Sequence, residues 1–107
     1  MTEEQNKYVE NLGYSQDRYN PRKWIKKHGD VSIEIYITIN SNNQVIGINM
    51  YIGVGNYLAD GDINTDLDVN LLADIPAMEK KLLNKQLLQV ERYKKHILEA
   101  INGDNVI

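Results

Sequence analysis

Apolar and polar residues alternate most regularly between Val31 and Val54. Successive side chains of a strand point to opposite faces of a sheet, so this alternation predicts two strands that each bury one face. A two-residue turn at Asn42 and Asn43 sets their register, because asparagine is among the few residues that tolerate the positive φ of such a turn. Five apolar pairs then share one face: Val31 with Val54, Ile33 with Ile52, Ile35 with Met50, Ile37 with Ile48, and Ile39 with Ile46.

A third alternating segment covers residues 62–71, after a turn that we expect over residues 56–61. As a strand it has one apolar face and one polar face. The apolar face carries Ile63, Leu67 and Val69, and the polar face carries Asp62, Asn64, Asp66, Asp68 and Asn70. Three carboxylates on one strand face indicate either an interaction surface or an edge that is protected from aggregation by charge.

Two short helices are predicted before the first strand. Thr2 followed by Gln5 has the form of a capping box, and Gly13 stands where a helix would stop, so residues 3–12 are the first helix. Pro21 follows an amide cap residue, and Gly29 is a second stop signal. These signals predict a second, basic helix of about two turns.

A long helix is predicted at the end of the chain, between Asp74 as its cap and Gly103 beyond its last turn. Its apolar residues recur at helical spacing. They are Leu83, Leu87, Val90, Ile97 and Ile101, flanked by Leu82, Tyr93 and Leu98. A helix of about 27 residues spans about 40 Å, whereas a ten-residue strand spans about 33 Å. One end should therefore overhang the sheet and need a partner.

The predicted fold class is α+β, in the order α-α-β-β-β-α. Two short N-terminal helices and one long C-terminal helix cover one face of a three-stranded antiparallel meander, and the polar face stays open. The chain has 107 residues, of which 42% are hydrophobic, and this is enough for one core. We therefore expect a single domain over residues 1–107.

The inventory of reactive residues argues against enzymatic activity. Cysteine is absent, which excludes thiolate chemistry and disulfides. The two histidines, His28 and His96, both stand beside lysines, and the glycines of residues 53–55 lack the spacing of a phosphate loop. No apolar run is long enough to span a bilayer. We expect a cytoplasmic, non-enzymatic protein that needs no cofactor and does not associate with membranes.

Charge is segregated along the chain, although the net charge is only −3. Residues 56–74 contain five aspartates and no lysine or arginine. Alternate residues of a strand are about 6.5–7 Å apart, which is comparable with the spacing of phosphates along a nucleic-acid strand. The acidic strand is therefore predicted to bind a basic groove of a protein partner, such as a nucleic-acid-processing enzyme, as a phage or mobile-element inhibitor would. The predicted surface consists of Glu34, Tyr36, Tyr51, Asp62, Asp66 and Asp68.

Two alternatives remain open at this point. The basic segment 18–28 combines charge with aromatic residues, as nucleic-acid-binding proteins do, and its candidate contacts are Arg18, Arg22, Lys23 and Lys27. Residues 60–68 place oxygen ligands at alternate positions, as a calcium-binding loop does, but neither alignment to such a loop supplies both its glycine and its bidentate acid. The basic helices of one copy can also neutralise the acidic strand of a second copy, so we expect a homodimer.

Overall fold

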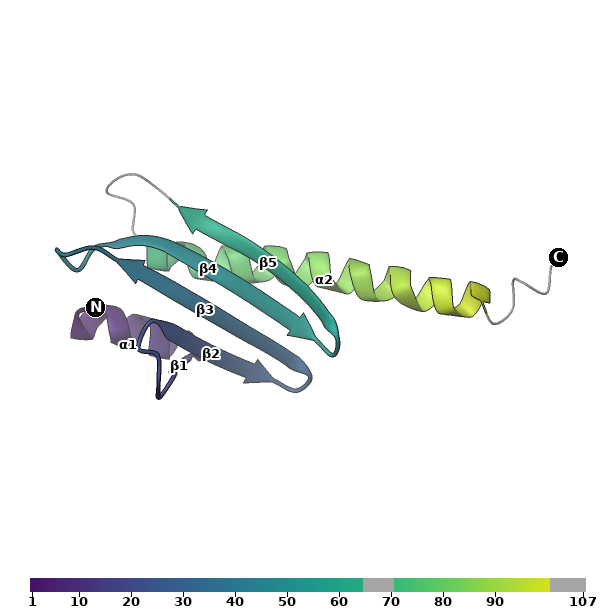
Figure 1. The fold of residues 1–107 in the computed structure, drawn as a ribbon, viewed down its shortest axis with the longest axis horizontal. Helices are drawn as coiled ribbons and strands as arrows, with labels where there is room; N and C mark the ends of the chain where they lie inside the picture. The colour runs from purple at the N-terminus through teal and green to yellow at the C-terminus, as the bar shows by residue number, and fades with distance from the viewer. Residues whose placement is uncertain (65–70, 101–107) are drawn as a thin grey trace.

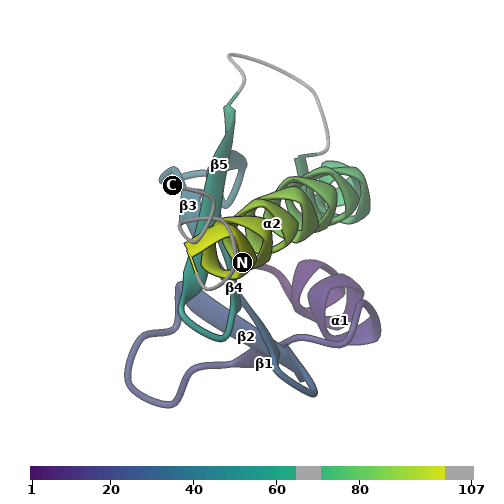
Figure 2. The same ribbon diagram turned by 90° about the vertical axis from the view of Figure 1, so that its right-hand side faces the viewer.

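The computed structural model describes residues 1–64 and 71–100. Within these residues, five strands form one antiparallel sheet in the order β1-β2-β3-β4-β5 (Figure 1). The elements are α1 (Glu3–Asn11), β1 (Ser15–Gln16), β2 (Lys23–His28), β3 (Val31–Ile39), β4 (Val45–Val54), β5 (Tyr57–Asn64), η1 (Leu71–Asp74) and α2 (Ile75–Leu98). Both helices lie on the same side of the sheet (Figure 2). The α+β character is as predicted, but the three-stranded meander with two N-terminal helices is wrong.

The predicted second helix is strand β2. Asn20 and Pro21 do not start a helix, because the carbonyl of Asn20 accepts a hydrogen bond from the amide of Lys23 at 3.0 Å and closes a turn. Asparagine followed by proline is typical of such turns as well as of helix starts. Trp24 points into the core with no exposed surface, and β2 pairs along its whole length with β3. Burial of Trp24 in a sheet therefore prevails over the local helix signals.

Strands β3 and β4 form the predicted hairpin, and four of the five predicted pairs are confirmed. The fifth is wrong, because the register shifts after Thr38 and Ile39 pairs with Val45. Ile46 is therefore 42% exposed. The connection is a longer loop rather than a two-residue turn: the side-chain oxygen of Asn40 accepts hydrogen bonds from two loop amides. Only the second residue of the predicted turn, Asn43, has a positive φ, at 60°.

Strand β5 begins five residues earlier than predicted. The turn is formed at Gly55, with φ of 62°, so that Val54 pairs directly with Tyr57. Gly61 belongs to the strand rather than to a turn, and it lies under α2, where a Cβ atom would stand 3.2 Å from a methyl carbon of Leu82. Asp62 is exposed, as predicted. The predicted strand residues 65–70 lie outside the described residues.

The predicted first and last helices are both α-helices in the structure. The predicted capping box of α1 is present, with Thr2 and Gln5 exchanging backbone and side-chain hydrogen bonds. Helix α2 has 24 residues and starts with proline in its first turn, although Asp74 makes no side-chain cap hydrogen bond. Its C-terminal part projects beyond the sheet, as predicted (Figure 1). The predicted residues Ile101 and Gly103 lie outside the described residues.

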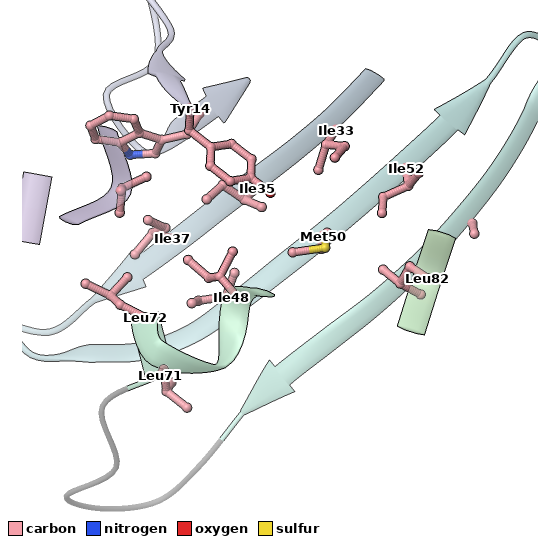
Figure 3. Packing of buried hydrophobic residues seen from close by; sticks show 14 residues of the cluster. Tyr14, Ile33, Ile35, Ile37, Ile48, Met50, Ile52, Leu71, Leu72 and Leu82 are labelled. Atoms are coloured by element: carbon pink, nitrogen blue, oxygen red, sulfur yellow. The ribbon is translucent and has the colours of Figure 1, made fainter. Parts of the chain in front are cut away.

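The core lies between the sheet and the helices (Figure 3). Isoleucines of β3 and β4 form its floor, and α2 contributes a different helical face from the one predicted. Ile75, Leu82 and Gln86 are the buried residues of α2, whereas Leu87 is 57% exposed. The buried hydrophobic side chains are Val9, Tyr14, Trp24, Ile33, Ile35, Ile37, Ile48, Met50, Ile52, Ala59, Leu71, Leu72, Ile75 and Leu82.

Candidate functional site

The face of the sheet opposite the helices carries an ordered array of polar and aromatic side chains. Strand residues that alternate with the buried ones point to this open face. The strand registers arrange them in rows that cross the sheet from β2 to β5. One row contains Ile25, Glu34, Tyr51 and Asp60; the next contains Lys23, Tyr36, Asn49 and Asp62; a third contains Lys27, Ser32, Gly53 and Leu58. Basic residues thus stand at the β2 side and acidic residues at the β5 side.

Two tyrosines stand in the middle of the open face. The rings of Tyr36 and Tyr51 meet edge to face, with centroids 5.8 Å apart and planes at 86°. The hydroxyl of Tyr36 donates a hydrogen bond to Glu34, whose other carboxylate oxygen lies 3.7 Å from the ammonium nitrogen of Lys23. The Glu34 carboxylate is the main cause of a raised pKa of Lys23. The ring pair is therefore held on its Tyr36 side by Glu34 and Lys23, and it presents a preorganised surface.

A shallow hollow lies beside the two rings. It has a volume of about 450 Å³ and is lined by Glu34, Tyr36, Asn49, Tyr51 and Leu58. Leu58, the second residue of β5, is 62% exposed and leaves an apolar side chain beside the hollow. On the same strand, Asp62 accepts a hydrogen bond from the side-chain amide of Asn49. An apolar wall, two aromatic rings, one carboxylate and one amide thus surround one concavity, and Asp62 stands beside it through its contact with Asn49.

Four of the six predicted surface residues are brought together here: Glu34, Tyr36, Tyr51 and Asp62. Asp66 and Asp68 lie outside the described residues. The sequence analysis missed Asn49, Leu58 and Asp60 as part of this surface. Ala59 and Asp60 continue the alternation of residues 62–71 backwards, but apolar Leu58 breaks it on the polar face and Gly61 is typical of a turn.

The basic segment 18–28 is not a helical surface. The guanidinium of Arg22 donates hydrogen bonds to the Ile37 carbonyl and to the Thr38 hydroxyl, at 3.2 and 2.6 Å. Lys23 is paired with Glu34, and Arg18 lies over the ring of Tyr19 at 5.9 Å. Lys27 is exposed on the open face. The four candidate nucleic-acid contacts are therefore spread over a loop and a strand, and Arg22 serves to join β2 to β3.

The described part of the predicted calcium loop is an extended strand. Asp60, Asp62 and Asn64 point to the open face of β5, each separated from the next by one inward-facing residue. Across residues 1–64 and 71–100, no group of three or more histidine, aspartate or glutamate side chains is placed to hold a metal ion. Residues 65–68 of the predicted loop lie outside this range.

A second polar cluster lies on the helical side of the sheet. The ammonium of Lys26 is 3.0 Å from Oε1 of Glu79, and the hydroxyl of Tyr14 donates to Oε2 of the same carboxylate at 3.2 Å. Burial, followed by the charge of Glu79, strongly raises the pKa of Tyr14. This cluster joins β2 to α2 and was not predicted, because nothing in the local sequence pairs residues so far apart. Its groups satisfy one another, which is typical of a structural contact.

No helix in the described part of the chain is long and apolar enough to cross a membrane. Searches against family models, curated proteins and solved structures found no match for this chain.

Proposed function

We propose that this protein acts by binding another protein through the open face of its sheet. The observation that carries this proposal is the hollow between Tyr36, Tyr51 and Leu58, which Glu34 of β3 borders. Asp60 and Asp62 of β5 stand next to it, opposite Tyr51 and Asn49 in the strand register. Tyrosine is enriched at protein interfaces because it combines a large contact area with a hydrogen-bonding group and loses little conformational entropy. A leucine that is 62% exposed at the rim adds apolar area that a partner would cover.

The chemistry of the surface favours a basic partner. Asp60 and Asp62 are exposed, and their alternate positions on β5 set them about 6.5–7 Å apart. Glu34 lies in the same row as Asp60, two strands away. An arginine or lysine of the partner can place its charge between these carboxylates and its stem against Leu58, and tyrosine faces also attract cations.

Within this proposal, the partner is a nucleic-acid-processing protein and the carboxylates take the positions of phosphates in its basic groove. The protein is then a cytoplasmic inhibitor of the kind that mobile elements encode. The corrected strand supports this idea in one respect, because it adds Asp60 to the exposed row that contains Asp62. Electrostatic complementarity of this type chiefly accelerates association and selects the partner.

The test is affinity capture from a low-GC bacterial lysate, with salt-gradient elution and identification by mass spectrometry. The wild type is compared with a variant that carries Asp60→Asn and Asp62→Asn. The matched control carries Glu4→Gln and Glu10→Gln, which remove the same charge from exposed positions of α1. A third variant, Leu58→Asn, removes the exposed apolar side chain beside the hollow without changing the net charge or the core.

We expect a protein with a basic groove to be retained by the wild type and by the α1 control, and to be lost from both open-face variants. Equal retention of the partner by all four proteins would exclude the open face as the binding surface. Capture of nucleic acid itself, lost when Arg22, Lys23 and Lys27 are changed to alanine, would support the alternative that the basic segment binds nucleic acid.

A further inference from the structure

The C-terminal part of α2 contributes little to the core of its own domain. Residues 91–100 are all exposed, and they project beyond the sheet (Figure 1). The Cα radius of gyration is 17.6 Å, whereas a compact chain of this length has a value of about 13 Å. Isolated helices are marginal in water, so the exposed part of α2, which gains little from packing on its own domain, would be stabilised by a further contact.

Helix α2 carries a second apolar stripe beside the face that packs on the sheet. Its first member, Leu83, is partly buried against the core, and its later members run into the exposed part of the helix. The sheet-facing residues are Ile75, Leu82 and Gln86, followed by Tyr93, which meets the ring of Tyr57 at a centroid distance of 5.2 Å. The second stripe lies roughly a quarter turn away around the helix. We name it the seam, and it consists of Leu83, Leu87, Val90 and Ile97.

The spacing of the seam is that of a coiled coil. Its members follow one another at intervals of four, three and seven residues, which is the 3.5-residue repeat that lets one helix pack along another. Lys94 occupies the one missing position in this repeat. Leu87 and Ile97 are 57% and 43% exposed, so the seam is open for a partner over the part of α2 that leaves the sheet.

We propose that the seam pairs with the same seam of a second copy of this chain, with the two helices antiparallel. Charge decides the direction. In a parallel pair, Lys94 would face Lys94 of the other copy, and like charges at such positions repel. In the antiparallel register that sets Leu87 against Ile97, Lys94 of one copy lies over Val90 of the other, one residue from the carboxylate of Glu91. The helix is thus self-complementary in one direction only.

Two leucines next to each other in the sequence provide a matched test. Leu87 belongs to the seam, whereas Leu88 points away from it, and the two side chains are 57% and 56% exposed. Leu87→Glu and Leu88→Glu therefore make the same chemical change at the same exposure. Sedimentation equilibrium should show a concentration-dependent dimer for the wild type and for Leu88→Glu, and a dissociation constant at least tenfold higher for Leu87→Glu. A monomeric wild type, or equal effects of the two substitutions, would overturn the proposal.

The direction is tested separately by disulfide formation, since the chain has no cysteine of its own. An equimolar mixture of Leu87→Cys and Ile97→Cys should form cross-linked dimers under mild oxidation faster than either variant alone. The antiparallel register brings position 87 of one chain next to position 97 of the other. It keeps each position away from the same position of the other chain. Faster cross-linking of Leu87→Cys with itself would show a parallel pair and contradict the register.

Discussion

The hydroxyl oxygen of Tyr14 lies 3.2 Å from Oε2 of Glu79, although 65 positions separate the two residues in the sequence. The other oxygen of that carboxylate holds Lys26 at 3.0 Å. One carboxylate of α2 therefore ties the helix both to β2 and to the segment that follows α1. The contact is partly buried, so it is screened less by solvent than the Lys23–Glu34 ion pair of the open face.

Tyr14→Phe should reduce the dependence of stability on alkaline pH. The phenol ionises at about 10.0 in the unfolded chain, whereas burial and Glu79 raise the pKa of Tyr14 in the native state. Above pH 10 the native state therefore binds more protons, and the free energy of unfolding falls as the pH rises. Urea denaturation at a series of pH values should show a shallower fall for Tyr14→Phe than for the wild type.

Near pH 8 the same variant should lose about 1.5–3 kcal/mol, because it lacks a hydrogen bond to a charged group. Its difference from the wild type should therefore shrink above pH 10. Tyr19→Phe is the control, since Tyr19 is 88% exposed, and it should follow the wild-type profile. Parallel profiles for Tyr14→Phe and the wild type would show that the Tyr14 proton is not linked to folding.

Gln86→Met should stabilise the protein. Gln86 has no exposed surface, and neither its amide nitrogen nor its oxygen has a hydrogen-bond partner among the described residues. A buried polar group without a partner costs about 1–3 kcal/mol, and methionine has a similar length without this cost. We expect a gain of about 1 kcal/mol or more in the free energy of unfolding, measured by urea denaturation.

Gln89→Met is the matched control for that substitution, because Gln89 is exposed on the same helix. It should change stability by less than about 0.5 kcal/mol. A loss of stability in Gln86→Met would mean that the buried amide is hydrogen-bonded in solution.

Gly61→Ala should destabilise the protein, although alanine usually stabilises a strand interior by about 0.5–1 kcal/mol relative to glycine. A Cβ atom at this position would stand 3.2 Å from atoms of both Met78 and Leu82. The side chains of Met78 and Leu82 would have to shift within the packed contact between α2 and β5, and overpacking of this kind costs about 1–3 kcal/mol. Thermal unfolding should therefore show a lower Tm.

Gly53→Ala serves as the comparison, since a Cβ atom there meets only the Tyr57 carbonyl oxygen, at an ordinary 3.7 Å. It should leave the Tm unchanged or raise it. If the two alanine variants behaved alike, close packing of α2 on β5 would not be the reason for a glycine at position 61.

Thr2→Ala should weaken α1 by removing one half of its capping box. The Thr2 hydroxyl accepts a hydrogen bond from the amide of Gln5 at 3.2 Å, and loss of such a cap costs about 1 kcal/mol. Thr2→Ser retains the hydroxyl and should remain close to the wild type. Native-state hydrogen exchange of the amides of α1 would localise the effect, and equal protection in both variants would show that the cap contributes nothing.

The β3–β4 hairpin could be predicted because the pattern that determines it lies within one short segment of the sequence. Alternation of isoleucine with polar residues determines which face is buried, and a shift by one residue would expose that whole apolar set. The error at Ile46 arose at the loop, where the side chain of Asn40 binds two loop amides and replaces the shorter turn. Turn geometry depends on such individual hydrogen bonds more than on periodicity.

The candidate surface was predictable in part for the same reason. Glu34, Tyr36 and Tyr51 follow from the hairpin register alone. The contribution of β5 depended on where that strand begins. Gly61 usually signals a turn, and its role as the place where α2 approaches the sheet requires a contact with Leu82 that is remote in sequence.

By itself, the sequence determined the capped first helix, the register of the central hairpin from Val31 to Ile37 and the presence of a long last helix, since each depends on neighbours within a few residues or on a strict period. Tertiary structure decided the rest. Residues 23–28 became a strand because Trp24 could be buried between β3 and the helices, and the packing of α2 on β5 decided which face of the long helix is buried. Burial and ladder hydrogen bonds between remote segments outweigh the small energies of local propensity, and no local pattern records them.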